Sequence, residues 1–352
     1  MKALIDWRHP LPDGVGRVPQ EDVLSEHLKR FSKKKTNNDF ETLKFDESLT
    51  MVGIEVEMEN YKGDQDENDL IYWAKDVDPS LRNSGIELRS VVLPSQKYVA
   101  AALTELSSFL KAQSRHDFSW RTSIHVHLDI TRLNLIEFCN FFLVYCSLEP
   151  LLFKVFAEER RNSVYCVPLF ESSLLTNKRE SALLANLFKS AKDRRDFNWG
   201  SSLGAEWSKD VKYSAINFFR LSDLGTVEFR HLAGTNKIER IRDWISALIS
   251  MLGCARGYNE KVSTLAEIIK ALNTKSNYFN YLESIFGDLT KLVIIPDYEQ
   301  YMVKGVRKCK EILASHGKVV SSLVKVSDNG AVSKHIKEIK EKQQQRLKRT
   351  YD

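Results

Sequence analysis

Four short segments of the chain alternate strictly between apolar and polar side chains, which is typical of β-strands with one face in a core. These segments are residues 53–59, 86–89, 124–129 and 226–230. In the first of them, Glu55, Glu57 and Glu59 share one face. In-line side chains on a strand lie about 6.5–7 Å apart, so one strand can offer two ligands to one metal cluster. The pattern predicts a sheet with an apolar face for packing and a polar face that carries carboxylates, histidines and an arginine.

A solvated polar face is the simpler explanation of such alternation, because any half-exposed antiparallel strand shows it. Solvated faces, however, usually carry Thr, Ser, Lys and charges of both signs. Here Glu55, Glu57 and Glu59 place like charges side by side, which costs stability unless a cation lies among them. Because four segments share this habit, we favour a functional face. At Glu59 we expect only a solvated strand end.

The segments between and after these strands predict helices and a hairpin. The predicted helices begin at Lys97 or span residues 135–156 and 238–254, and the predicted hairpin joins residues 213–219 to residues 226–231. Strands mixed with helices and hairpins in this order favour an α+β fold with a curved antiparallel sheet. We expect the helices to pack on the apolar face of the sheet.

Composition shifts along the chain predict three regions. We expect a polar N-terminal extension over residues 1–50, a catalytic domain over residues 51–260 and a helical C-terminal region over residues 261–352. Five cysteines without a CxxC pair do not suggest a disulfide framework, so we expect a reducing, cytoplasmic location. The apolar run at residues 135–156 is interrupted by polar residues and predicts a buried helix rather than a membrane span.

The net charge of +5 is concentrated at the C-terminal end. Residues 302–352 contain thirteen Lys or Arg against five Asp or Glu, a net charge of +8, which leaves the rest of the chain at −3. We expect a solvated, basic helical tail there, with a Glu338–Lys342 pair at helical spacing. Binding of nucleic acid by this tail is the alternative that we do not favour.

Phosphate-binding loops of the G-x-x-x-x-G-K-S/T and G-x-G-x-x-G types are absent from the sequence, so metal ions and arginines would have to hold any nucleotide phosphates. In the order G-I-E-V-E, D-P-S-L…E-L-R, H-V-H-L-D and N…E-F-R…G-T, the motifs resemble those of the amidoligases of the glutamine synthetase and glutamate–cysteine ligase superfamily. The resemblance covers roughly residues 51–258. It implies a sheet of the glutamine synthetase-like type.

The resemblance also implies an ATP-dependent ligase that joins a carboxylate to an amine through an acyl phosphate. Amino acids or peptides would be its substrates, and ATP with Mg²⁺ or Mn²⁺ its cofactors. The implied metal ligands are Glu55, Glu57, Glu87, His127 and Glu228. The implied nucleotide contacts are His125, Asn217 and Arg230. The implied catalytic residues are Arg230, Arg161 and Asp78. Of His125 and His127, one would bind metal and the other would orient a ligand or contact the nucleotide. Arg160 and Arg161 fit the position of the site arginine equally.

Two departures from the family pattern restrict what the resemblance implies. Pro79 stands where a glycine is usual, and residues 172–212 match no pattern that would reveal the substrate. Two alternatives stay open. One is a metal-dependent hydrolase of the amidohydrolase type, whose H-x-H strand is followed by further histidines on a barrel. The other is a non-enzymatic binding or structural protein that keeps the ligase fold.

Overall fold

The computed structural model describes residues 50–62, 70–93, 96–113, 115–130, 133, 135–172, 175, 212–218, 220, 224–257 and 262–315. These residues form two compact units. Of the described residues, those from 50 to 130, from 162 to 166 and from 212 to 242 belong to the first unit, and those from 133 to 161, from 167 to 175 and from 243 to 315 belong to the second. The predicted extension before residue 50 and most of the predicted basic tail lie outside the described residues. The predicted domain boundaries stay predictions.

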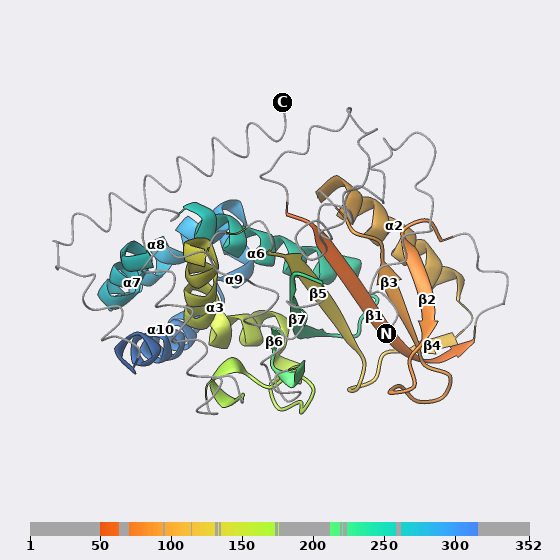
Figure 1. Cartoon of the computed structure of the whole chain (residues 1–352). Helices are drawn as coiled ribbons and strands as arrows, with labels where there is room; N and C mark the ends of the chain where they lie inside the picture. The colour runs from red at the N-terminus through yellow and green to blue at the C-terminus, as the bar shows by residue number, and fades with distance from the viewer. Residues whose placement is uncertain are drawn as a thin grey trace, which may run out of the picture. The chain divides into compact units, whose positions relative to one another are not determined.

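An open antiparallel sheet forms the first unit (Figure 1). Its strands are β1 (Val52–Lys62), β2 (Trp73–Val77), β3 (Ile86–Ser90), β4 (Arg115–Asp117), β5 (Ser123–Asp129), β6 (Ile216–Asn217) and β7 (Thr226–Ala233). They follow the order β2-β3-β1-β5-β7-β6, and β4 pairs with β1. All pairs among the described strands are antiparallel. The predicted α+β fold with an antiparallel sheet is therefore confirmed, and the four alternating segments are neighbours in that sheet.

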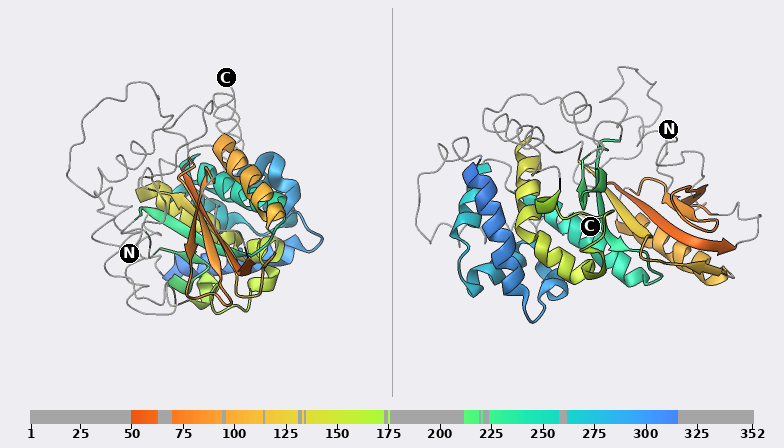
Figure 2. Two further views of the ribbon diagram at one scale, coloured as in Figure 1. Left: turned by 90° about the vertical axis from the view of Figure 1, so that its right-hand side faces the viewer. Right: turned by 90° about the horizontal axis from the view of Figure 1, so that it is seen from below.

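The apolar face of the sheet packs against helix α2 (Gln96–Ala112), which lies along the strands in Figure 2. Trp73 is buried on this face, and its indole Nε1 donates a hydrogen bond of 2.9 Å to the carbonyl oxygen of Ala102. The ring of Tyr61 stacks on Phe109 of α2, with 6.1 Å between centroids. Unbroken alternation would place Tyr61 on the opposite face, beside Glu59. A register irregularity between Glu59 and Lys62 turns Tyr61 towards the helix, and Asn60 has a φ of 54° at that point.

The second unit is helical. Its elements are α3 (Leu135–Phe156), η1 (Glu158–Arg160), η2 (Leu169–Glu171), most of α6 (Ile238–Gly257), α7 (Val262–Ala271), α8 (Lys275–Phe286), η6 (Gly287–Leu289), α9 (Thr290–Val293) and α10 (Tyr298–Ser315). The predicted helices over residues 135–156 and 238–254 are confirmed. Helix α3 packs against α10 and α7. A Cβ atom on Gly305 of α10 would lie 2.1 Å from the carbonyl oxygen of Ser147, so the glycine permits the close approach of α10 to α3.

Helix α3 is the apolar segment that the sequence predicted to be buried. Its residues Glu137–Phe156 are long and apolar enough to cross a membrane, but 83% of this apolar window is buried inside the protein. A buried carboxylate, Glu149, ties α3 to η2, because its Oε1 accepts 2.6 Å hydrogen bonds from the Tyr145 hydroxyl and the Leu169 amide. The helix therefore has the character of a core helix. A cytoplasmic location stays a prediction.

Candidate active site

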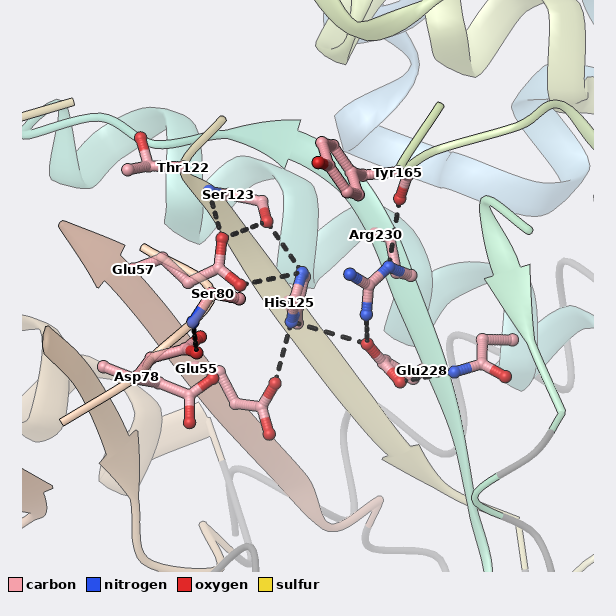
Figure 3. Close-up of polar contacts among 12 residues, drawn as sticks. Glu55, Glu57, Asp78, Ser80, Thr122, Ser123, His125, Tyr165, Glu228 and Arg230 are labelled. Atoms are coloured by element: carbon pink, nitrogen blue, oxygen red, sulfur yellow. Dashed lines mark hydrogen bonds and ion pairs between the residues drawn. The ribbon is translucent and has the colours of Figure 1, made fainter. Parts of the chain in front are cut away.

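The strand register brings the predicted polar positions together on one face of the sheet. Glu57 of β1 lies opposite Glu87 of β3, and Glu55 lies opposite His125 of β5. Further along, Glu228 of β7 lies between His127 and Asn217 of β6. Side chains directly opposite one another on antiparallel strands are in contact range. Figure 3 accordingly shows His125 surrounded by carboxylates that come from different strands.

Three groups of these side chains have the geometry to hold a cation. They are Glu55 with His127 and Glu228, Glu55 with Glu87 and His125, and Glu57 with Asp78 and Glu87. Within each group, the oxygen and nitrogen atoms that could bind a metal lie within 4.8 Å of one another. All five predicted metal ligands occur in these groups, together with Asp78 and His125. Their role as ligands stays a prediction.

Ser123 and His125 join the two central carboxylates. The amide and the hydroxyl of Ser123 donate hydrogen bonds of 2.8 and 2.6 Å to Glu57 Oε2. The same hydroxyl lies 2.7 Å from His125 Nε2, and His125 Nδ1 lies 2.8 Å from Glu55 Oε2. All four side chains are buried. Both nitrogens of His125 are therefore engaged within the cluster. Sequence reasoning missed Ser123, although its position two residues before His125 placed it on the same face.

Two side chains that were predicted to contact the nucleotide, those of Asn217 and Arg230, hold Glu228 in place. Asn217 Nδ2 donates a 2.6 Å hydrogen bond to Glu228 Oε2, and Arg230 Nη1 forms an ion pair with Glu228 Oε1. Arg230 Nε also donates to the carbonyl oxygen of Tyr165, at 3.1 Å. These contacts fix the guanidinium beside the carboxylates. A guanidinium has five N–H donors, so Arg230 can keep both contacts and still bind an anion.

The charges on this face are unevenly compensated. Burial raises the pKa of Glu87 to about 10, and the negative charges of Glu55 and Glu57 add to the effect. Burial alone would also raise the pKa of Glu55, but His127 and His125 hold it well below its usual range. At Glu228, burial is likewise outweighed by Arg230, and the pKa is lowered. The carboxylates thus exceed the cations around Glu87, an environment that favours a bound positive ion.

His127 offers a specific test of whether a metal fits this site. Its Nδ1 lies 3.1 Å from the Thr226 hydroxyl, and its buried Nε2, 3.5 Å from Glu55 Oε1, has no hydrogen-bond partner among the described residues. Metal-binding histidines commonly use one ring nitrogen for the metal and place the other against an oxygen, as Nδ1 is placed against Thr226 here. A ring nitrogen and a carboxylate oxygen that face each other at this distance can both bind one metal ion between them. The residues present therefore fit a divalent cation.

Glu59 differs from the sequence prediction. Instead of being a solvated strand end, it is buried, with 5% of its surface exposed. Its Oε1 accepts a 2.9 Å hydrogen bond from the amide of Arg82 and lies 3.7 Å from Arg121 Nε. The prediction was wrong because β1 continues past Glu59 to Lys62, and because the turn between β2 and β3 and the segment before β5 both contact this side chain.

The site arginine of the predicted family pattern falls in the second unit. Arg160 is buried at the end of η1, whereas Arg161, the residue predicted to be catalytic, is exposed and follows it. The catalytic role of Arg161 stays a prediction. Within the first unit, sequence reasoning gave no role to Arg89, which forms ion pairs with Asp76 and Glu87 on the carboxylate face.

The fold and this cluster define an α+β protein whose antiparallel sheet carries a candidate active site of carboxylates and imidazoles on one face. Residues 26–251, more than half of the chain, match the family described as "Putative amidoligase enzyme", and the chain belongs to this family. The match confirms the resemblance noted from the motifs and begins within the predicted N-terminal extension. No curated protein matches the chain. Family membership indicates an enzyme that forms amide bonds.

Proposed function

We propose that this protein is an ATP-dependent carboxylate–amine ligase with a sheet of the glutamine synthetase-like type. Its substrates would be amino acids or peptides. The single observation that carries the proposal is the meeting of Glu55, Glu57, Glu87, His127 and Glu228 on one sheet face, in three groups suited to a cation. Family membership supports the same reaction class.

The donor set supports Mg²⁺ or Mn²⁺ rather than a softer ion. Carboxylate oxygens predominate, imidazole nitrogen is the minor donor, and no cysteine belongs to the three groups in the described part of the chain. Hard divalent cations prefer such oxygen-rich sites. When bound, the ion would neutralise charge on the phosphates of ATP.

The reaction places defined demands on the protein. In the first step of ligation, a carboxylate oxygen of the substrate would attack the γ-phosphorus of ATP, and ADP would leave. In the second step, the amine would attack the carbonyl carbon of the acyl phosphate and lose a proton, and phosphate would leave. Arg230 would stabilise the charge on the transferred phosphoryl group, because Glu228 and Tyr165 already hold its guanidinium in place. His125 would orient Glu55 and Ser123 rather than contact the nucleotide, since both its nitrogens are engaged.

The amidohydrolase alternative is disfavoured by the sheet itself. That fold is a barrel of parallel strands with metal-binding histidines on later strands, whereas every strand pair among the described residues is antiparallel. A non-enzymatic role for the fold is the remaining alternative. The retention of all five predicted ligand positions argues against it.

The test of the proposed function is a screen for ADP release. The full-length protein would be incubated with Mg²⁺, ATP and a panel of amino acids and short peptides, and the products examined by mass spectrometry. We expect at least one pair of substrates to yield ADP together with a product lighter than the sum of the substrates by one water. ATP binding without turnover by any pair would favour the non-enzymatic alternative, and hydrolysis of a substrate without ATP would exclude the ligase.

A further inference from the structure

The turn that joins β2 to β3 carries one of the candidate ligands, Asp78, but little of the turn is buried. Residues 79, 80 and 82–84 are exposed, and Asn83 and Ser84 have φ values of 50° and 60°. The left-handed conformation costs roughly 1–2 kcal/mol for a residue such as Ser84, whereas asparagine tolerates it better. Within the turn, the Asp78 amide donates a 3.4 Å hydrogen bond to the Gly85 carbonyl, and the Leu81 amide donates a 3.1 Å hydrogen bond to the Asp78 carbonyl. Contacts from outside the turn add to these two bonds.

Two side chains from outside the turn supply such contacts. Glu59 Oε1 accepts a 2.9 Å hydrogen bond from the amide of Arg82, and Arg121 Nη2 donates a 2.8 Å hydrogen bond to the carbonyl oxygen of Ser80. Arg121 Nε and Glu59 Oε1 lie 3.7 Å apart, so the two form an ion pair. We refer to Glu59 and Arg121 as the clamp. The Ser80 amide in turn donates a 2.8 Å hydrogen bond to Asp78 Oδ1, which connects the clamp to the candidate ligand.

Both members of the clamp are themselves fixed. Glu59 is buried on β1, in line with Glu55 and Glu57. The guanidinium of Arg121 lies 5.8 Å from the ring centroid of Tyr165 and 5.7 Å from that of Trp120, distances at which cation–π attraction operates. Because Glu59 belongs to β1, the clamp connects the turn to that strand.

We infer that Glu59 and Arg121 are positioning residues that hold the Asp78 carboxylate within reach of Glu57 and Glu87. The inference rests on the proposed function, because a fixed Asp78 matters only if the three carboxylates bind a cation together. Glu59 itself belongs to none of the three candidate metal groups among the described residues, although it is in line with two of their members. The strand thus uses Glu55 and Glu57 in the candidate site and Glu59 to place a further carboxylate from another segment. A carboxylate has two oxygens, so Asp78 can accept from Ser80 and still offer an oxygen to the cation.

The test compares Mn²⁺ binding by full-length variants, measured by titration calorimetry without nucleotide. Arg121→Ala removes the contact to Ser80, and we expect Mn²⁺ to bind about 10-fold more weakly, as for other losses of groups that orient metal ligands. The matched control is Arg82→Ala. Arg82 is exposed and contacts Glu59 through its backbone amide, which the substitution leaves in place, so we expect affinity as in the unmodified protein.

Glu59→Gln is a second and milder variant. Its amide oxygen can still accept from Arg82, while the charge that pairs with Arg121 is lost, so we expect a smaller loss of Mn²⁺ affinity than for Arg121→Ala. Both residues act on the same turn, so the effects of the two substitutions should not be additive. We expect the double variant to lose measurably less Mn²⁺ affinity than the sum of the two single losses.

Hydrogen exchange of the metal-free protein gives a readout that does not depend on activity. We expect the amides of Ser80 and Arg82 to exchange faster in Arg121→Ala, with no change in the amides of β1 and β5. The inference is overturned if Arg121→Ala binds Mn²⁺ as tightly as the unmodified protein, or if Arg82→Ala weakens binding equally. If the unmodified protein binds no Mn²⁺, both the proposed function and the inference fail. If the unmodified protein and the clamp variants bind Mn²⁺ with equal affinity, only the inference fails.

Discussion

Glu57 and Arg230 carry opposite charges on the same sheet face, and the proposed reaction requires both. Glu57→Gln keeps the shape of the side chain and removes a charge that would bind the cation, so we expect it to abolish ATP-dependent ligation. Arg230→Ala removes a donor that stabilises charge developing on the phosphoryl group, which is worth on the order of 10²–10³ in rate for one preorganised donor. Both losses would be measured as ADP release with a substrate pair identified by the screen.

A matched control for these variants lies in the second unit. Glu158 is an exposed carboxylate whose Oε1 lies 3.2 Å from Lys154 Nζ, and surface pairs of this kind contribute little to stability. We expect Glu158→Gln to retain full activity. Circular dichroism would confirm that all three variants are folded. If folded Glu57→Gln and Arg230→Ala proteins were as active as the unmodified one, the ligase proposal would be wrong.

The side chains of the candidate site were predictable from sequence to the extent that they follow the period of a strand. Alternation placed Glu55 with Glu57, and His125 with His127, on one face of their own strand, and the pairing of β1 with β5 then brought the two sets together. The burial of Glu59 was not predictable, since it depends on a turn and on Arg121, which reach it from other parts of the chain. Periodicity assigns a face to a residue, but tertiary contacts decide its surroundings.

At the level of elements, the contact between α3 and α10 allows a sharp prediction. A Cβ on Gly305 would meet the Ser147 carbonyl oxygen at 2.1 Å. Because this neighbour is backbone, it has little freedom to shift. Alanine is favoured over glycine in a helix by roughly 1 kcal/mol, but overpacking costs typically 1–3 kcal/mol and more against backbone. We expect Gly305→Ala to lower the free energy of unfolding, as measured by urea denaturation.

Gly253 in α6 is the matched control for Gly305. It also lies inside a helix, but a Cβ at this position would meet nothing within 4 Å. We therefore expect Gly253→Ala to raise the free energy of unfolding by about 0.4–1 kcal/mol, because alanine restricts the unfolded chain. Equal effects of the two substitutions would contradict the close packing of α10 on α3.

The connection between α3 and η2 through Glu149 predicts a pH dependence of stability. Burial raises the pKa of Glu149 to about 7 from an ordinary value of 4.5, and hydrogen bonds from Tyr145 and Leu169 only partly oppose this. The unfolded chain therefore loses this proton at lower pH than the folded protein does. The contribution of Glu149 to stability is complete below about pH 4.5, falls as the pH rises towards 7 and is constant above it, a total change of about 3 kcal/mol.

Glu149→Gln removes this titration without a large change of shape. The measurement is the difference in the free energy of unfolding between Glu149→Gln and the unmodified protein, taken from pH 4 to pH 8 by chemical denaturation, so that the other titrating groups cancel. We expect this difference to shift in favour of the variant as the pH rises from about 4.5 to 7. A difference independent of pH, or a shift in the opposite direction, would show that folding does not raise the pKa of Glu149.

Among the elements, the long helices and the four alternating strands were predicted, whereas strands β2 and β4 were not. Helices α2, α3 and α6 carry many apolar residues at helical spacing, so the signal accumulates over their length. Strand β2, with the sequence W-A-K-D-V, lies at the edge of the sheet and does not alternate strictly between apolar and polar residues. Strand β4 has only three residues. Such segments become strands because a neighbour pairs with them, which their own sequence does not encode.

For the whole molecule, the excess of carboxylates over cations predicts stabilisation by metal. A ligand that binds only the folded state stabilises it by about 2.7 kcal/mol at 100 times its Kd. We expect millimolar-range Mg²⁺ with ATP to raise the melting temperature of the full-length protein, and to raise that of Glu57→Gln much less. Thermal melts that do not respond to Mg²⁺ and ATP in the unmodified protein would weigh against both proposed cofactors.

The burial of all five cysteines has a practical consequence for the study of this molecule. Cys166 belongs to the first unit, and Cys139, Cys146, Cys254 and Cys309 belong to the second. A thiol reagent reaches a buried cysteine only when its surroundings open. Burial also raises the pKa of Cys254 and Cys309 to about 12, so little of the reactive thiolate is present while the fold is closed. Labelling rates read at each cysteine by mass spectrometry would therefore time the opening of each unit separately. Equal rates would mean that the sheet and the helices unfold as one cooperative body, and faster modification of Cys166 would mean that the first unit opens alone.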